Sequence, residues 1–168
     1  MEVFEAARTA LAVRAFQDKP VPQESVDRIV EAARLTASSQ NGQPWHFIVV
    51  QNRDALRKLG ETVRSGPYTA QAALAVVVVI DRTPFAVSDA SRAIQTMILT
   101  AWSEGIGSNW VGFVPMPAVN KVLDIPENLD VLAIIPFGYP VKTIGKGQKK
   151  RKPVSEVIYR EKFGHAYK

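Results

Sequence analysis

The chain has 168 residues, of which 46% are apolar and 22% charged, a composition typical of one globular domain with a single core. It contains no cysteine and only two histidines, which excludes disulfides, thiolate metal sites and a cysteine nucleophile. We therefore expect no metal site. The net charge of +5 favours an anionic ligand, and part of the excess lies in GKGQKKRK, residues 145–152.

The N-terminal segment does not have the pattern of an export signal. Acidic residues stand where a signal peptide would be basic, and Arg8 and Arg14 interrupt its short apolar run. The longest apolar run, residues 72–80, is far below the roughly 18 residues that indicate a membrane span. We expect a soluble, unprocessed, cytoplasmic protein.

The first half of the chain predicts a helix, a strand, a second helix and a second strand. Apolar residues at helical spacing follow two prolines and predict a helix from near Gln23 to Leu35. Residues 45–51 are β-branched and aromatic, which indicates a buried strand, and Asn52 is placed to cap the helix that follows. Residues 73–80 predict another buried strand.

The second half continues the alternation of helices and strands. A long helix is predicted from Ser88, which would cap it, to Glu104, with Gly105 ending it. A strand broken at Gly112 follows from Gly107. The remaining predicted elements are a helix over 117–123, a strand over 131–137 and a final helix that begins at Ser155. No internal repeat or linker is visible, so we expect one domain, residues 1–168, of α/β or α+β class around a central sheet.

The loop SSQNGQPW, residues 38–45, carries two hydroxyls, three amides and a glycine immediately before a buried strand. Ser, Asn and Gly are common turn residues, and a plain connection is one interpretation. The excess of amides favours another, because amides near a buried strand need hydrogen-bond partners. A planar heterocycle with ring nitrogens and edge carbonyls would supply them.

The segment GSNWVGF, residues 107–113, has two readings as well. It is an ordinary strand with a glycine bulge, or Gly112 allows the backbone to approach a ligand. In the second case an N–H from Val111 or Gly112 would be the donor, and a flavin ring nitrogen accepts such a bond.

The basic run could be a solvated face, a nonspecific nucleic-acid contact or a phosphate site. One Arg with one or two Lys satisfies a phosphate monoester, and Arg14 is a plausible further contributor. The cations of the run are Lys146, Lys149, Lys150, Arg151 and Lys152. We expect no nucleic-acid partner, because the tail lacks an aromatic stacking surface.

Motifs for several other chemistries are missing from the sequence. There is no GxGxxG after a strand, no P-loop and no nucleophile elbow, and no Ser/His/Asp arrangement is readable. Any catalysis would therefore depend on a bound cofactor rather than on catalytic side chains.

The segments VRAFQDKPVP, ASSQNGQPWHFIVV, DASRAIQTMILTAWSEGIGSNWVGF, IPENLDVLAIIPFGYP and KKRKP resemble, in this order, the nitroreductase-like flavoprotein family. The resemblance runs from about Val13 to Pro153. It implies an α+β fold, with a central, mostly antiparallel sheet flanked by helices, and an intertwined homodimer with FMN at the subunit interface. It also implies reduction by NADH or NADPH, ping-pong transfer to a small-molecule electron acceptor, and a C-terminal extension, residues 141–168, that wraps the partner subunit.

The same resemblance assigns roles to individual residues. Loop residues contact the flavin, two backbone amides face its ring, and three cations hold its phosphate. These groups are, in that order, Ser38, Ser39, Asn41 and Gln43; Val111 and Gly112; and Arg14, Lys149 and Arg151. No catalytic side chain is implied.

The sequence departs from the family pattern at the N-terminal phosphate motif. Ala10 and Ala12 stand where the family carries an Arg and a Ser, and a charge-assisted contact contributes about 1.5–3 kcal/mol. Arg8 or Lys150 could compensate; otherwise the chain is a flavin-binding or flavin-free module without turnover. The short spacing between Ile80 and Asp89 predicts an open pocket with little substrate selection.

Overall fold

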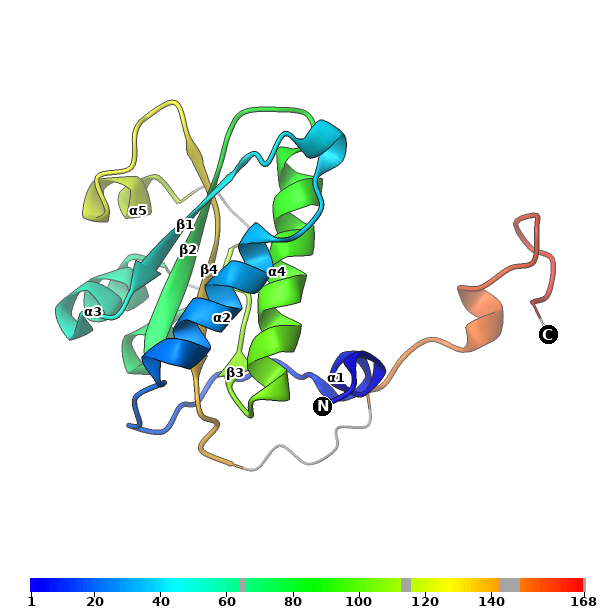
Figure 1. Cartoon of the computed structure of the whole chain (residues 1–168), viewed down its shortest axis with the longest axis horizontal. Coiled ribbons are helices and arrows are strands. Elements are labelled where there is room, and N and C mark those ends of the chain that lie inside the picture. The colour runs from blue at the N-terminus through cyan, green and yellow to red at the C-terminus, as the bar shows by residue number, and fades with distance from the viewer. Residues whose placement is uncertain (64–65, 113–115, 143–148, 168) are drawn as a thin grey trace.

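The computed structural model describes residues 1–63, 66–112, 116–142 and 149–167. Its strands form a four-stranded antiparallel sheet in the order β1-β2-β4-β3 (Figure 1). The strands are β1 (Trp45–Val50), β2 (Leu74–Ile80), β3 (Gly107–Ser108) and β4 (Asp130–Gly138). The α-helices are α1 (Val3–Thr9), α2 (Gln23–Arg34), α3 (Arg53–Thr62), α4 (Ala86–Ser103) and α5 (Pro117–Val122), with short 3-10 helices η1 (Ser39–Asn41), η2 (Pro67–Gln71) and η3 (Val154–Glu156). The expectation of an antiparallel sheet flanked by helices is confirmed.

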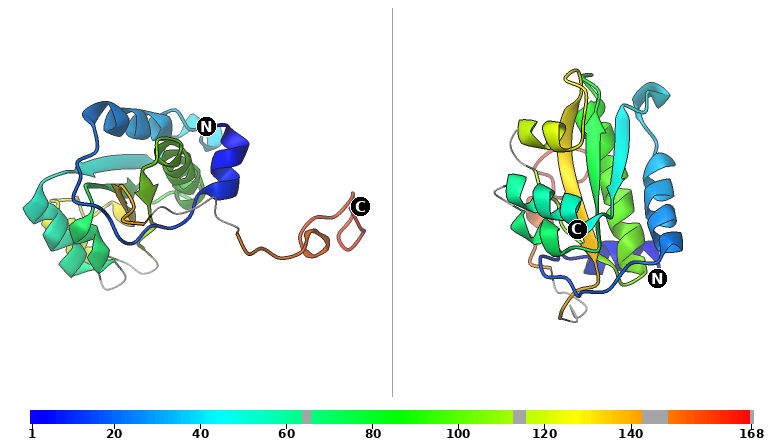
Figure 2. Two further views of the ribbon diagram at one scale, coloured as in Figure 1. Left: turned by 90° about the horizontal axis from the view of Figure 1, so that it is seen from below. Right: turned by 90° about the vertical axis from the view of Figure 1, so that its left-hand side faces the viewer.

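Strand β2 is buried on both faces, because helices cover each side of the sheet (Figure 2). Val76 and Val78 lie in the core cluster that contains Ile94 and other residues of α2 and α4. The alternate residues of β2 lie in a second cluster with residues of α3 and α5. Successive side chains of a strand point to opposite faces, so a strand covered on both sides reads as a continuous apolar run.

The helix boundaries confirm one expected cap and correct another. The Asn52 side chain accepts hydrogen bonds from the N–H groups of Asp54 and Ala55 at 3.0 and 3.1 Å, so it caps α3 as predicted. Helix α4 begins two residues before Ser88, after Phe85, because Ala86 is already packed in the core. The expectation that Ser88 is the cap was wrong; its hydroxyl donates to the Phe85 carbonyl within the first turn.

The N-terminal segment is fastened to the far end of α4 and to the β3 edge of the sheet. Trp102 Nε1 donates to Thr9 Oγ1 at 2.9 Å, which joins α1 to the last turn of α4. The Val13 N–H donates to the Ser108 carbonyl at 2.8 Å. Arg14 is therefore held beside β3, with its own side chain exposed.

Strand β3 is shorter than the sequence predicts. Regular pairing with β4 ends after Ser108, and Val111 then returns to β4 through an isolated bridge to Ile134. The buried Asn109 side chain bonds to the Tyr68 hydroxyl and to the Trp110 carbonyl. The interruption therefore falls at residues 109 and 110, before Gly112.

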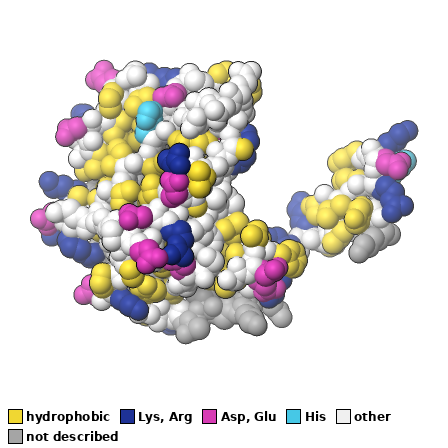
Figure 3. Space-filling view, viewed as in Figure 1, with side chains coloured by type: hydrophobic (Ala, Val, Ile, Leu, Met, Phe, Trp, Pro, Cys, Tyr) yellow, Lys and Arg dark blue, Asp and Glu magenta, His cyan; other side chains and the backbone are white. Residues whose placement is uncertain are grey.

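The C-terminal residues 149–167 extend away from the rest of the chain (Figure 1). Apolar side chains gather on this tail, and Val154, Val157, Ile158 and Phe163 are exposed (Figure 3). The helix expected from Ser155 was wrong, since only the 3-10 turn η3 forms. A short segment that packs on nothing does not offset the cost of nucleating a helix.

Among the described residues, no helix is both long enough and apolar enough to cross a membrane.

The two candidate caps give a matched pair of variants. We expect Asn52→Ala to lower the free energy of unfolding by about 1 kcal/mol, because two N–H groups of α3 lose their acceptor. Ser88→Ala should change it by less than about 0.5 kcal/mol, since an exposed hydroxyl inside the first turn is lost. Urea titrations at one protein concentration measure both, and a larger loss for Ser88→Ala would contradict the assignment.

Candidate functional site

The loop between α2 and β1 adopts a strained backbone. Gln40, Asn41 and Gln43 have φ of 53°, 54° and 48°, in the left-handed region. Asn tolerates this region, whereas for other residues it costs on the order of 1–2 kcal/mol each. Strain of this kind persists only where surrounding contacts hold it and is concentrated at ligand sites.

Hydrogen bonds inside the loop leave several of its polar groups without a partner. The backbone N–H of Gln43 donates to Ser38 Oγ at 3.0 Å. The side-chain nitrogen of Gln43, Nε2, lies 3.3 Å from both the backbone and the side-chain oxygen of Asn41. Within the described residues, the Ser38 hydroxyl proton, the Asn41 amide nitrogen and the Gln43 side-chain oxygen have no partner. These three groups, on largely exposed residues, are the ones the loop offers to a ligand.

Ser39, expected at the ligand, is engaged by α4. Its N–H donates to Asp89 Oδ2 at 2.9 Å and its hydroxyl donates to Asp89 Oδ1 at 3.0 Å. Asp89 is fully buried and was missed by the sequence analysis. A signal was present, because Asp89 lies on the same helical stripe as the buried Ala93 and Met97, and a charge on an inward stripe needs a partner.

The two backbone N–H groups expected to face a ligand differ in their availability. The Val111 N–H donates to the Ile134 carbonyl at 2.9 Å, which commits it to the sheet. The Gly112 N–H has no partner within the described part of the chain. Gly112 itself is held by its neighbours: its φ is +144°, and an added Cβ would lie 2.7 Å from the Leu132 carbonyl oxygen. Of the two, only Gly112 has a donor to offer.

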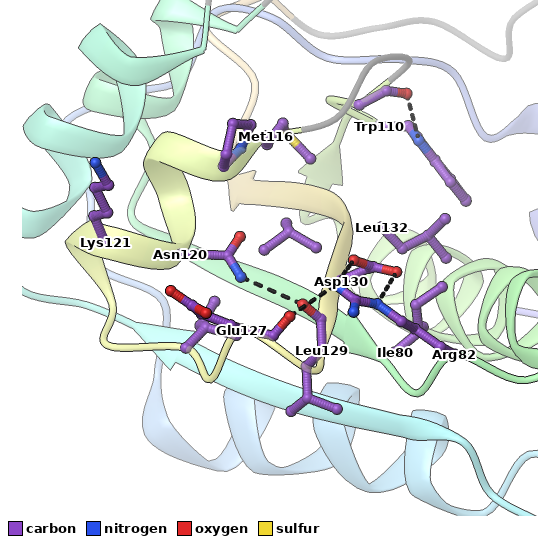
Figure 4. Close-up of a pocket in the computed structure, with 14 residues that line it drawn as sticks. Ile80, Arg82, Trp110, Met116, Asn120, Lys121, Glu127, Leu129, Asp130 and Leu132 are labelled. Carbon is purple, nitrogen blue, oxygen red and sulfur yellow. Dashed lines mark hydrogen bonds and ion pairs between the residues drawn. The ribbon is translucent and has the colours of Figure 1, made fainter.

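A pocket of about 820 Å³ lies beside Gly112, a volume within the usual range for small-molecule sites. Its walls are mainly apolar, and its rim carries the ion pair of Arg82 with Asp130 (Figure 4). Arg82 also donates to the Glu127 carbonyl at 2.7 Å, so it ties the end of β2 to the chain before β4. Trp110 and Met116 contribute to the apolar lining, and the sequence analysis had singled out neither.

Three predicted phosphate-binding cations have no carboxylate partner among the described residues. Burial, and then the charge of Arg151, lower the pKa of Lys149, so Lys149 is a cation in a place that disfavours positive charge. Lys149 Nζ donates to the Ala7 carbonyl, which brings the start of the tail to α1. Arg14 and Arg151 also form no ion pair there. A phosphate would relieve the repulsion between Lys149 and Arg151.

The two residues suggested to compensate for Ala10 and Ala12 differ in whether their charge is already paired. Arg8 is paired with Glu5 at 2.8 Å, so its charge is already neutralised within α1. Lys150 is exposed and forms no ion pair in the part of the chain that the structure describes. Lys146 and Phe113 lie outside the described residues.

Apart from the Val111–Gly112 segment beside β4, the predicted site residues fall into two groups at opposite ends of α4. The loop is anchored at Asp89, while Thr9 and the segment that carries Arg14 are anchored at Trp102. At 1.5 Å rise per residue, these two points on α4 are about 20 Å apart. The loop and α1 accordingly lie far from each other in Figure 1.

The family model described as the nitroreductase family matches residues 7–84 and 80–139. The chain belongs to the nitroreductase family. A relative in Methanothermobacter thermautotrophicus, provisionally named NADH dehydrogenase/NAD(P)H nitroreductase, is 36% identical over 154 residues, which cover 86% of this chain and 81% of that protein. The FMN reductase [NAD(P)H] of Bacillus subtilis is 26% identical over 187 residues, covering 96% and 74%.

Solved structures have the same nitroreductase fold. A crystal structure from Bacteroides thetaiotaomicron with the same provisional name aligns with a TM-score of 0.87 at 29% identity, covering 96% of this chain and 98% of that one. The FMN-dependent nitroreductase of Clostridium difficile R20291 aligns with a TM-score of 0.84 at 25% identity, covering 95% and 99%.

Gly112 and Gly105 form a matched pair for testing how firmly the backbone beside the pocket is held. Gly105 has φ of +78° and no atom within 4 Å of an added Cβ, so Gly105→Ala should cost about 1–2 kcal/mol from backbone strain alone. Gly112→Ala should cost at least about 1 kcal/mol more, because its Cβ overlaps Leu132. Denaturant titrations measure the free energy of unfolding of both variants. Equal decreases would show that the backbone beside the pocket shifts easily to accommodate the added Cβ.

Proposed function

We propose that this nitroreductase-family protein is an FMN-dependent NAD(P)H oxidoreductase that reduces nitroaromatic, quinone or similar acceptors. The observation that carries the proposal is the Gly112 N–H, which has no partner in the described chain and stands beside an apolar pocket. A planar ring system fits such a wall, with one backbone donor to orient it. The names of the relatives in Bacillus subtilis and Clostridium difficile, which include FMN, support the same cofactor.

Three sets of residues carry groups of the kind that FMN needs. Gly112 would donate its N–H to the ring, and Ser38, Asn41 and Gln43 would supply hydrogen bonds through their unpaired groups. Arg14, Lys149 and Arg151 would hold the phosphate, whose charge offsets theirs. The site so assigned uses no catalytic acid or base.

When bound, FMN would supply the redox chemistry, taking electrons from NADH or NADPH and passing them to the acceptor. The protein's contribution is to bind, to orient and to set the electrostatic environment. The connection from Ile80 to α4 is short, residues 81–85, so it supplies no long cover over the pocket. We therefore propose that reductant and acceptor use the same open site in turn, which is a ping-pong order with broad acceptor selection.

The cofactor site is proposed to lie between two copies of the chain in a homodimer. The loop and the phosphate-binding cations occupy opposite ends of α4, so a partner's loop would complete the site. The exposed apolar side chains of the tail also need cover, and we propose that the extension, residues 141–168, wraps the partner. Val3 and Phe4 on α1 are also exposed, and they add to the apolar surface near the start of the tail.

Visible absorbance of the purified protein tests the proposed activity. We expect the protein to retain FMN after excess cofactor is removed, and NADH or NADPH to bleach it under anaerobic conditions. Arg151→Ala should weaken FMN binding by about one to two orders of magnitude, because a charge-assisted contact is lost. Arg160→Ala, which removes another tail cation, is the matched control and should leave binding unchanged.

Two results would count against this function. A colourless protein that does not keep FMN would mean that Ala10 and Ala12 are not compensated, and it would favour a module without turnover. Retained FMN that neither nicotinamide bleaches would remove the oxidoreductase assignment while leaving the binding site in place.

Mixed dimers test whether the site is shared. Asn41→Ala and Arg151→Ala chains, co-expressed with different tags and purified as a pair, should carry one intact site and one doubly altered site. An FMN titration is then expected to show half of the sites at the affinity of the unaltered protein. If each site belonged to a single chain, both sites of the mixed dimer would be weakened and none would be tight.

A further inference from the structure

Asp89 is the one fully buried charged side chain among the described residues, and each of its oxygens is hydrogen-bonded. Oδ2 accepts the Ser39 N–H at 2.9 Å. Oδ1 accepts the Ser39 hydroxyl at 3.0 Å and an Arg92 guanidinium N–H at 2.5 Å. A buried carboxylate is stable only with such a set of partners, so these contacts account for its position.

These contacts also fasten the first part of the loop to α4. Within the described residues, the hydrogen bonds between Ser39–Gln43 and α4 all run through Ser39, to the side chains of Asp89 and Arg92. The end of the loop also meets the sheet through its backbone, since the Gln43 and Pro44 carbonyls accept the N–H groups of Trp45 and Asp81 at 2.8 and 3.3 Å. The bonds of the Gln43 N–H and side chain are internal to the loop. They lie at exposed residues, where water competes for the same groups.

The loop needs an anchor because its backbone is unfavourable in isolation. Gln40, Asn41 and Gln43 all have positive φ, and nothing in their side chains apart from that of Asn41 favours this conformation. Ser39 immediately precedes the three. A fixed Ser39 therefore sets the point from which the left-handed turn begins.

We propose that Asp89 is a positioning residue, which clamps Ser39 so that Ser38, Asn41 and Gln43 are presented to the cofactor. The inference rests on the proposed function, because it concerns the FMN site. Asp89 does not touch the ligand itself, since it is buried and its oxygens are occupied by Ser39 and Arg92. Ser39 is an anchor of the loop rather than a contact to FMN.

Asp89→Asn tests the clamp. An amide at this position presents an N–H toward Ser39 or gives up one of its acceptors, so the native loop becomes less populated. If that population falls to about a tenth, the apparent Kd for FMN rises about tenfold. Hydrogen exchange should become faster in residues 38–43 and stay unchanged in β2.

Three further variants sharpen the test. Ser39→Ala should weaken FMN binding in the same direction, and the Asp89→Asn/Ser39→Ala double variant should be no weaker than the worse single one, because both remove one interaction. Ser38→Ala combined with Asp89→Asn should instead add its own loss. Asp54→Asn is the matched control. Asp54 also lies in the first turn of a helix and pairs with an Arg three residues on, but its side chain is exposed, and α3 packs on the face of the sheet opposite to α4.

The outcomes separate the clamp from the function on which it rests. FMN affinity and loop exchange that stay unchanged in Asp89→Asn, with only a lower melting temperature, would overturn the clamp and leave an ordinary structural role. An unaltered protein that binds no FMN would overturn the proposed function and the clamp together. If Asp89→Asn does not fold, Ser39→Ala carries the test alone, with a rise of a few-fold in Kd expected and an unchanged Kd overturning the inference.

Discussion

Burial of β2 on both of its faces is the constraint on which the rest of the structure depends. Because Val76 and Val78 pack against one pair of helices and their neighbours in the strand against another, neither helical layer can shift without exposing apolar surface. The segments that carry the candidate site are extensions of those layers. The loop follows α2, the Gly112 segment follows α4 and β3, and residues of α5 form one side of the pocket.

The site is made from backbone and side-chain groups that the fold leaves without partners. The Gly112 N–H, the unpaired groups of the loop and the cations Arg14, Lys149 and Arg151 belong to different elements. The N–H of the buried Gly112 costs stability while it is unpaired, and a ligand that accepts it recovers part of that cost. The loop groups and the cations are largely hydrated, so a ligand exchanges their water for its own contacts.

Most of the secondary structure follows from local patterns. The valine run of β2, the helical spacing of Val26 and Ile29 and the cap at Asn52 each reflect interactions within a few residues or a face wholly covered by neighbours. The start of α4 was misplaced because the packing of Ala86, a tertiary contact, outweighed the preference of Ser88 for a cap position. The expected final helix failed for the opposite reason, since in the described chain nothing covers its apolar side chains.

The sequence predicted which segments carry the candidate site, but not what each of their residues contacts. Amides and glycine beside a strand indicated the loop and the Gly112 segment, yet the pattern could not show that Ser39 bonds to Asp89 or that Val111 pairs with Ile134. Both contacts join residues far apart in the sequence. The family resemblance could not predict these contacts either, because it matches residue positions rather than hydrogen bonds. The pocket lining at Trp110 and Met116 likewise depends on how α5 folds back over the sheet.

Helix α4 also acts as a spacer of fixed length. One end holds the loop through Asp89 and the other holds the N-terminal segment through Trp102, so the distance between them is set by the number of residues in the helix rather than by any flexible joint. Inserting one residue between them would lengthen that distance by about 1.5 Å and turn one end by about 100° relative to the other. The rotation would carry Ala93 or Met97 out of the core. A change of length within α4 is therefore disfavoured, and the separation of the two anchor points is as rigid as the core itself.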